Sequence, residues 1–286
     1  MDEDIRQNFK NRDSALKKKL SIFAIIITAF TVWYFFVYKP RIQRTRPLEY
    51  TEIISGGGHI LWGYPTGPDV MIFEYEGFVS GYDTLKLNPR WVSYNLKKEY
   101  IFGKKYMNSR RFIPEPSLQR HQSAQNRDFT RSGYDRGHIA RQSNMRGRSL
   151  LCEQQACYFT NVSPQTPHFN RVVWSNIENL AINLTKTYGE SWIIAGPYFQ
   201  DRVLLLNDRV RIPCGFYKIV VLKTDEGHLP LAFVLDHDAE SMNPEDYMVT
   251  IDSVQTLTGI DFFHELEDKI EAVFESKLVP LPYGWR

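Results

Sequence analysis

The sequence is poor in cysteine and lacks the spacing of a structural zinc site. It has three cysteines among 286 residues, and no two of them form a CxxC motif, which argues against a zinc site. Cys152 and Cys157 could form a disulfide in an oxidising compartment, but Cys214 would then be left over. Three reduced thiols that pack as small buried hydrophobic side chains are the simpler expectation.

Internal repeats, low-complexity segments and nucleotide-binding loops are also missing. The glycines at 56–58 are not followed by Lys-Ser or Lys-Thr, so they do not form a phosphate loop, and we interpret them as flexible chain. Aromatic residues make up 14% and charged residues 24% of the sequence, as is usual for a folded globular protein. The even composition after the glycines predicts one domain over residues 61–286.

Lysine is absent between residues 110 and 148, whereas arginine is concentrated there. The window holds nine Arg and three acidic residues, a net charge of +6, although the whole chain carries only +2. Arginine binds phosphate oxygens through a planar fork of donors, which lysine cannot offer. A solvated basic face would explain the run as well, but its position around His138 favours a channel for a polyanion.

One uncharged run is long enough to cross a membrane. Residues 20–38 carry no charge, and as a helix they would extend roughly 28 Å, close to the thickness of about 30 Å of a hydrocarbon core. Lysines precede the run, and aromatic residues gather at its C-terminal end, as in a membrane-interface belt. Its bulky end favours an uncleaved anchor over a signal peptide or a buried core helix.

The charges beside this run predict its orientation. Six Lys and Arg precede residues 20–38, and four follow within about twenty positions, which favours a cytoplasmic tail at 1–19 and a domain outside the cytosol. Residues 39–60 would form a linker. The compartment would be a bacterial periplasm or cell surface, or alternatively the space between mitochondrial membranes.

Short apolar runs separated by turn residues predict a strand-rich domain with few long helices, which is an α+β class. A turn is expected at Asn88-Pro89-Arg90, and Gly196-Pro197 should end the strand that precedes it. The expected strands are 70–75, 78–82, 91–95, 157–161, 191–195, 216–223 and 229–235, and the expected helices are 168–187, 253–259 and one after 265.

The strongest functional signal is Tyr-Asp-Arg-Gly-His at 134–138, followed by Asn170 and Glu178. Near pH 7 a neutral His138 can accept a proton from water. The amide oxygen of Asn170 suits Mg²⁺, which keeps most of its waters and takes one or two protein ligands. Arg136 would clamp a scissile phosphate. Each residue alone has an ordinary structural explanation, so the assignment depends on the combination.

Two strands and a helix would bring these groups around one ion. One strand ends near His138, a second runs into Asn161, and a helix begins after Pro167. Asn170 and Glu178 lie two steps of four residues apart, so an α-helix would place them on one face. Glu178 would orient a water or support Asn170 from behind, and Asn161 would fix the loop that aims the site.

These segments resemble the DNA/RNA non-specific endonucleases, which have the ββα-metal, or His-Me, finger. The resemblance covers nearly all of residues 61–286. It implies an α+β nuclease domain with a central mixed or antiparallel sheet and with Mg²⁺, or Mn²⁺ in its place, as the cofactor. The segments that carry it are SGYDRGHIARQSNM (132–145), FTNVSPQTPHFNRVVWSNIENL (159–180), GYPTGPD (63–69), NPRWV (88–92), IIAGPYF (193–199), IPCGFYKIVV (212–221) and SVQTLTGIDFF (253–263).

The resemblance also implies roles for single residues. His138 would be the general base and Asn170 the metal ligand, with Arg136 on the phosphate and Glu178 behind the metal site. Arg141 stands where the family usually has proline, which puts the local loop conformation in question. The remaining catalytic candidates are Asn161 and the upstream arginine of the family, which falls at Arg110 or Arg111, with Arg110 favoured. The candidate substrate contacts are Arg111, Arg141, Gln165 and Arg171.

The sequence therefore predicts a membrane-anchored, Mg²⁺-dependent endonuclease that hydrolyses DNA and RNA to 5′-phosphate products. Because no base-reading motif is present, we expect recognition through backbone phosphates. Two alternatives stay open: a catalytically silent module for nucleic-acid binding or DNA uptake, and a 5′ exonuclease on the same fold. Many members of the family dimerise, so a homodimer is expected.

Overall fold

The computed structural model describes residues 25–33, 51–109, 111–200 and 203–282. The chain forms two units, residues 1–46 and residues 47–286. In the first unit, residues 25–33 are helical. The flanks of the predicted anchor, residues 20–24 and 34–38, lie outside the described residues. Within the described part of the chain, none of the helices combines the length and the apolar character needed to span a bilayer.

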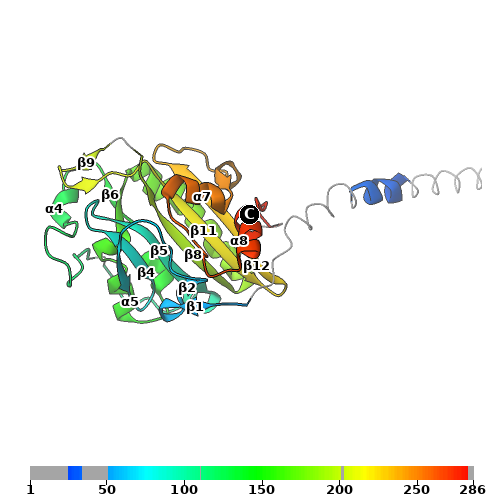
Figure 1. Ribbon diagram of the computed structural model, residues 1–286, viewed down its shortest axis with the longest axis horizontal. Coiled ribbons are helices and arrows are strands. Elements are labelled where there is room, and N and C mark those ends of the chain that lie inside the picture. The colour runs from blue at the N-terminus through cyan, green and yellow to red at the C-terminus, as the bar shows by residue number, and fades with distance from the viewer. Residues whose placement is uncertain (1–24, 34–50, 110, 201–202, 283–286) are drawn as a thin grey trace, which may run out of the picture. The chain divides into compact units, whose positions relative to one another are not determined.

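A seven-stranded sheet forms the centre of the second unit (Figure 1). Its strand order is β13-β12-β11-β8-β5-β4-β3, and every neighbouring pair is antiparallel. The predicted α+β class with a central sheet is therefore confirmed, and the sheet is antiparallel rather than mixed. The strands are β3 (Met71–Glu74), β4 (Val79–Asp83), β5 (Asn88–Lys97), β8 (Glu190–Tyr198), β11 (Gly215–Thr224), β12 (Gly227–Asp236) and β13 (Met248–Val249).

Both faces of this sheet are covered, as the sequence of β11 shows. Successive side chains of a strand point to opposite faces. Phe216 and Val220 belong to one buried cluster together with helix α6 (Ser175–Tyr188). Tyr217 and Ile219 belong to a second cluster with helix α7 (Ile251–Thr258) and helix α8 (Asp268–Glu275). Figure 1 shows α7 and α8 over the sheet beside β11 and β12. A strand that is buried on both faces is a continuous run of apolar residues in the sequence, so β11 could be predicted from that run.

The glycines at 56–58 are ordered, contrary to the expectation of flexible chain. They form a 3₁₀ turn, η2, between β1 (Ile54–Ser55) and β2 (Ile60–Leu61), which pair with each other. The indole Nε1 of Trp192 donates a hydrogen bond of 3.1 Å to the carbonyl of Gly58. This contact joins the turn to the central sheet, so the ordered domain includes residues assigned to the linker.

Three local predictions were wrong. Residues 157–161 do not form a strand, because Phe159–Asn161 is a 3₁₀ turn, η4, and the strand β7 begins only at Val162. Asn88-Pro89-Arg90 is the start of β5 rather than a turn. Gly196-Pro197 does not end β8, which continues to Tyr198. In each case tertiary pairing overrides a local turn or strand signal.

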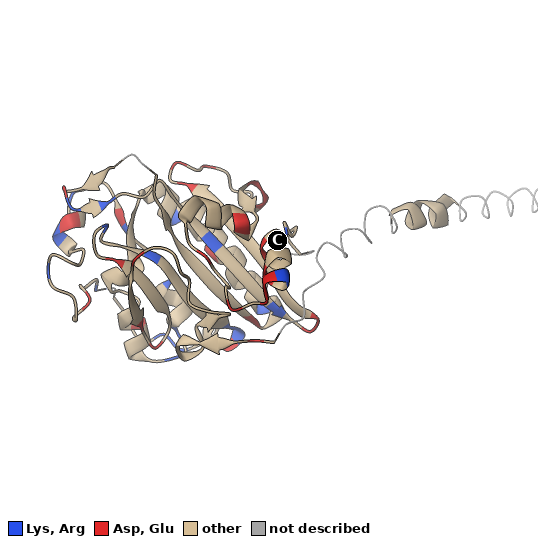
Figure 2. Ribbon diagram, viewed as in Figure 1, with Lys and Arg blue, Asp and Glu red and all other residues tan. Residues whose placement is uncertain are grey.

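The arginine-rich window does not form a single element. Acidic and basic positions are spread over the second unit (Figure 2). All three cysteines are free thiols, so the disulfide between Cys152 and Cys157 is absent. The other elements are α3 (Lys98–Ile101), α4 (Asn126–Phe129), β6 (Asp135–His138), η3 (Gln142–Met145), α5 (Leu150–Gln155), β7 (Val162–Gln165), η5 (Phe169–Trp174), β9 (Leu205–Leu206), β10 (Val210–Arg211) and η6 (Pro244–Tyr247).

Candidate active site

Two short strands and a helix form the frame of the site. β6 pairs antiparallel with β7, so that Gly137 lies opposite Ser163 and His138 opposite Val162. After Thr166 the chain is helical from Pro167 onward and passes into η5, which continues as α6. This is the ββα arrangement that the sequence predicted, with its second strand placed later in the chain than expected.

Only glycine fits at position 137, because a side chain there would collide with its neighbour. A Cβ at this position would lie 2.1 Å from Oε1 of Gln165, which is far inside van der Waals contact. The side chain of Gln165 is fully buried against this glycine. Neither its Oε1 nor its Nε2 has a hydrogen-bond partner among the described residues. The predicted contact of Gln165 with substrate is not supported by this position, and its packing instead restricts residue 137 to glycine.

His138 lies at the end of β6 with a small opening to solvent. It is 9% exposed, and its ring centre is 5.0 Å from that of Phe112. Its Nε2 lies 3.9 Å from the sulfur of Cys157. The contacts with Phe112 and Cys157 restrict the orientation of the ring.

Asn161 fixes the backbone that follows His138. Its Oδ1 accepts a hydrogen bond of 2.7 Å from the N–H of Ala140. Its Nδ2 donates to the carbonyls of Ala140 and Ala156, at 2.9 and 2.8 Å. The side chain is fully buried, so these bonds form in a medium where an unpaired partner would cost roughly 1–3 kcal/mol. Asn161 thus holds the loop after the candidate base, as its predicted positioning role requires.

Asp135 brings β6 and η5 together. Its Oδ2 accepts a hydrogen bond of 3.0 Å from Nδ2 of Asn170. Arg171 donates to both carboxylate oxygens, at 2.8 Å each. Burial acts to raise the pKa of Asp135, but the hydrogen bonds of Arg171 and Asn170 and the charges of Arg171 and Arg136 outweigh it, so the pKa lies below its ordinary value. Asp135 is therefore an anion that orients the amide of Asn170.

Asn170 and Arg171 lie in a π-helix, which the sequence did not reveal. A π-turn holds more residues than an α-turn, so the predicted α-helical face from Asn170 to Glu178 is not continuous. His237 supports the segment just before it. Its Nε2 accepts a hydrogen bond of 2.9 Å from the N–H of Thr166, and its Nδ1–H donates to the carbonyl of Pro213 at 3.1 Å. Burial lowers the pKa of His237, which keeps the neutral ring that these two bonds need.

Arg136 is held from the other side of β6. Its Nη2 donates to the carbonyl of Asn126 at 2.8 Å. The guanidinium carbon lies 5.3 Å from the ring centre of Phe129 and 5.9 Å from that of Phe112. Burial lowers the pKa of Arg136, although the charge of Asp135 opposes this. Phe112 therefore contacts both Arg136 and His138 and fixes their spacing.

Glu178 pairs with an arginine on the loop that follows β6. Its Oε2 is 3.7 Å from Nε of Arg141, whose Nη1 donates to Asn179 at 2.7 Å. Arg141 therefore connects the loop after His138 to α6 through an ion pair. A buried lysine on β11, Lys218, lies near this pair, and its Nζ is 4.2 Å from the ring centre of Trp174. Burial lowers the pKa of Lys218 to about 8, and the charge of Glu178 acts against that effect.

Two predicted arginines remain. Arg110 lies outside the described residues, and Arg111 is exposed on the segment before Phe112. Sequence reasoning missed four contributors. Asp135 stands within the motif itself and could have been found there, whereas the other three come from distant segments with no local signal. These are Cys157, Lys218 and His237.

The donor set of this site fits one hard divalent cation. Nδ2 of Asn170 is occupied by Asp135. No described residue donates a hydrogen bond to its Oδ1, which is thus available as an oxygen ligand. Mg²⁺ binds through few protein oxygens and keeps several waters, so a single amide oxygen beside a carboxylate is a sufficient protein contribution.

Fold and sequence together define the class of hydrolytic nucleases. Residues 55–269, more than half of the chain, match the DNA/RNA non-specific endonuclease family. The chain therefore belongs to this family of hydrolases that act on nucleic acids.

Relatives and a solved structure agree with this membership. Endonuclease G, mitochondrial, of Bos taurus is 29% identical over 199 residues, which are 65% of this chain and 66% of that protein. Nuclease EXOG, mitochondrial, of Homo sapiens is 27% identical over 224 residues, which are 72% of this chain and 60% of the relative. A nuclease of Nostoc sp. is 29% identical over 240 residues, covering 77% and 85%. A chain in the crystal structure of an EndoG/EndoGI complex superposes with a TM-score of 0.67 at 27% identity, over 77% of this chain and 96% of that one. The matched region thus spans about two thirds or less of the mitochondrial relatives named here.

Proposed function

We propose that this protein is a Mg²⁺-dependent endonuclease that hydrolyses DNA and RNA to products with 5′-phosphate ends. The observation that carries this proposal is the bond from Asn170 to Asp135, three residues before His138 on the same strand. It joins a candidate metal ligand and a candidate base to one four-residue strand. The description of the family, which is non-specific for DNA and RNA, supports both substrates.

Side chains of this protein accept the proton and stabilise the charge that develops in the reaction. His138 accepts a proton from a water molecule, whose oxygen attacks phosphorus as the bond to the 3′ oxygen breaks. The leaving 3′ oxygen takes a proton from solvent. Arg136 binds the phosphate that carries the developing negative charge, while Asp135 and Asn161 hold the two walls of the site in place. Since these contacts involve only the backbone of the nucleic acid, cleavage is weakly dependent on sequence.

Asn170 would hold Mg²⁺ through Oδ1, and when bound the ion supplies positive charge that offsets the charge developing on the phosphate. Glu178 is paired with Arg141 at 3.7 Å. It supports the site through Arg141, which ties the loop after His138 to α6.

Cleavage of closed circular plasmid and of RNA tests the proposal. The full chain with Mg²⁺ should degrade both, and His138→Ala should reduce the rate by about 10²–10⁴-fold, the usual contribution of a general base. His121→Ala is the matched control, because this histidine is exposed and belongs to no part of the site; its rate should match wild type. Activity that persists in His138→Ala or in excess chelator would refute the mechanism.

The same assay separates the two other candidate functions. A 5′ exonuclease would leave closed circular DNA intact and degrade linear DNA. A silent binding or DNA-uptake module would retain both DNAs in a salt-dependent complex without cutting them.

We further propose that the run at 20–38 anchors the chain in a membrane, with residues 1–19 in the cytoplasm and the nuclease domain on the other side. The uncharged length of this run supports the anchor, and the mitochondrial names of the relatives favour the intermembrane space over a bacterial periplasm. Carbonate extraction and protease protection of native membranes test both statements. Light scattering of the purified chain tests the expected homodimer.

A further inference from the structure

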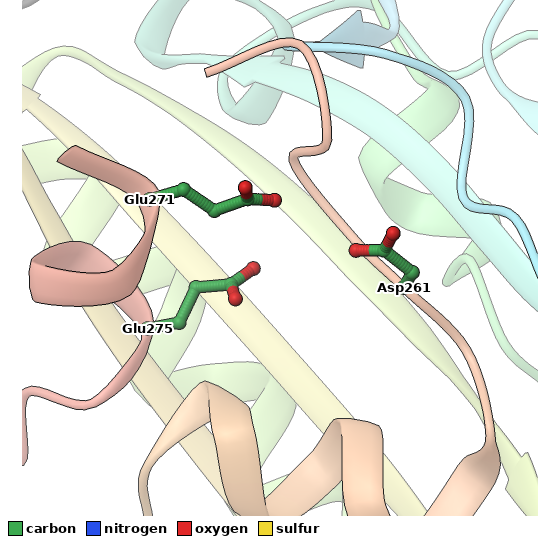
Figure 3. Close-up of side chains that lie close together, drawn as sticks. All are labelled: Asp261, Glu271 and Glu275. Carbon is green, nitrogen blue, oxygen red and sulfur yellow. The ribbon is translucent and has the colours of Figure 1, made fainter. Parts of the chain in front are cut away.

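Three carboxylates gather on the side of the sheet that is covered by α7 and α8. Glu271 and Glu275 are four residues apart and so lie one turn apart on α8. Asp261 comes from the segment that follows α7. One carboxylate oxygen of each residue lies within 4.8 Å of the corresponding oxygens of the other two. Figure 3 shows that the three side chains extend from two segments toward a common space.

Glu275 is the member that indicates a ligand. It is only 4% exposed, and its Oε1 is buried without a hydrogen-bond partner among the described residues. Its Oε2 accepts one hydrogen bond of 2.8 Å, from Nε2 of Gln255. Buried carboxylates in folded proteins are normally paired with a cation or bound to a metal. No Lys or Arg in the described ranges lies within 4.0 Å of a carboxylate oxygen of the cluster.

The electrostatics of the cluster agree with this geometry. Burial, followed by the charges of Glu271, Asp252 and Asp261, raises the pKa of Glu275 to about 8. Burial and the neighbouring acids also raise the pKa of Glu271, against a smaller opposite effect of His264. The neighbouring acids therefore repel the charged form of Glu275, and a bound cation would relieve that repulsion.

The backbone around the three carboxylates is already fixed. The N–H and the carbonyl of Asp261 form hydrogen bonds with Thr66, at 3.0 and 2.9 Å. Oε1 of Gln255 accepts a hydrogen bond of 2.8 Å from the N–H of Phe262, while its Nε2 donates to Glu275. The segment after α7 and the last turn of α8 are thus joined through one glutamine, so a cation would bind donors that are held in place.

We propose that Asp261, Glu271 and Glu275 bind a divalent cation of the Ca²⁺ type, separate from the candidate Mg²⁺ ligand Asn170. Ca²⁺ binds six to eight oxygens at about 2.3–2.6 Å, so opposite ligands lie about 4.6–5.2 Å apart. Carboxylate oxygens within 4.8 Å of one another can therefore share one such ion. Mg²⁺ requires shorter bonds and a stricter octahedron, which three carboxylates on two segments match less well. The bound ion would tie α8 to the segment after α7.

Two measurements on the full chain test the site after treatment with chelator. Titration with Ca²⁺ should raise the midpoint of thermal unfolding by about 5–10 °C at 100-fold excess over the dissociation constant. Tb³⁺ should become luminescent on excitation of tryptophan, because the ring centre of Trp62 lies 5.3 Å from that of Phe274, the neighbour of Glu275. Added Ca²⁺ should displace Tb³⁺ and remove this signal, and Mg²⁺ should do so only at much higher concentration.

The matched pair of variants is Glu271→Gln with Glu275→Gln, against Asp225→Asn with Glu226→Gln. The second pair removes two exposed carboxylates from the turn between β11 and β12. In chelator, the first double variant should melt above wild type because the repulsion is gone, yet it should lose both the Ca²⁺ shift and the Tb³⁺ signal. The control pair should keep both. Asp261→Asn, an exposed position, serves if the double variant does not fold, and it should weaken Ca²⁺ binding at least tenfold. A wild-type chain without a Ca²⁺ shift, or variants with an unchanged one, would overturn the proposal.

Discussion

The elements that cover the two faces of the central sheet are held in place by different kinds of contact. On one side, α7 has local signals at both ends: the hydroxyl of Thr250 accepts a hydrogen bond from the N–H of Ser253, and Gly259 ends the helix in the left-handed conformation. On the other side, the finger of β6, β7 and η5 depends on bonds between distant segments. Asn161 reaches back 21 positions to Ala140, and Thr166 reaches forward 71 positions to His237. The helix that covers the first side is therefore specified by residues next to it in sequence, whereas the geometry of the finger is specified by tertiary contacts.

This difference predicts that substitutions on the two sides affect different measurements. Substitutions around α7 and α8 should change the free energy of unfolding and leave the cleavage rate of the folded enzyme unchanged. The finger should control the rate or the use of metal, with little effect on stability.

The largest effect on stability should come from Trp192→Ala on the side of α7 and α8. The ring is 1% exposed, and its Nε1 donates to Gly58. Its loss leaves a cavity that should cost about 3–5 kcal/mol of unfolding free energy. Urea unfolding measures this value, and nuclease assays at low temperature should show a rate per folded molecule equal to wild type. A lower rate in a folded variant would mean that the two sides are coupled.

An acid-dependent loss of stability should come from His59, which is buried between η2 and β2. Its Nε2–H donates to the carbonyl of Glu76, and its Nδ1 accepts from the N–H of Asn95. Burial, and then the charge of Arg148, lower the pKa of His59 to about 4 from an ordinary value of 6.5. Because the unfolded chain takes up the proton first, the stabilisation is complete above pH 6.5 and is lost as the pH falls toward 4.

The expected loss between pH 7 and pH 4.5 from this residue is about 2–3 kcal/mol, from 1.36 kcal/mol for each unit of pKa difference. Urea unfolding at both pH values should show it in wild type. His59→Gln should have a correspondingly flatter dependence on pH, although it should be less stable at neutral pH. Equal slopes for the two proteins would exclude His59 as the source.

The smallest effect should come from Asp135→Ala on the finger. Loss of the group that orients a metal ligand typically weakens metal binding by about 10–100-fold, so the Mg²⁺ concentration for half-maximal activity should rise by this factor. Stability should change by less than about 1 kcal/mol, because the ion pair with Arg171 is near the surface. Arg171→Ala keeps the bond from Asn170 to Asp135 and should shift the Mg²⁺ requirement much less. Equal shifts in both variants would assign the effect to charge rather than to orientation of the amide.

Sequence reasoning found the sheet, the helices and the ββα order because these have local signals. β11 and β12 were predicted close to their observed ends, since ten-residue strands buried on both faces are apolar runs. The finger was predicted less well. Residues 157–161 have strand-forming side chains, but the bonds of Asn161 to Ala140 and Ala156 favour a turn. Likewise, nothing in the sequence between 169 and 174 indicates a π-helix.

The site residues divide in the same way. His138 and Asn170 were predicted from their type and spacing, and these roles stay predictions, although Asp135 connects Asn170 to the strand of His138. Gln165 was assigned to substrate because it is polar and follows the site in sequence, but it is buried against Gly137. The contributions of His237 and Lys218 depend on strands that lie far along the chain, so no local pattern could reveal them.

The pairing of β6 with β7 has one further consequence for how the molecule loses activity. The base and the amide that would hold the ion are both attached to this short two-stranded pair, which is not part of the large sheet. Small units of this kind open more readily than the strands of a large core. Opening would separate both groups from each other in a single event. A partly opened molecule would thus not cleave nucleic acid at all, instead of cleaving it with altered selectivity.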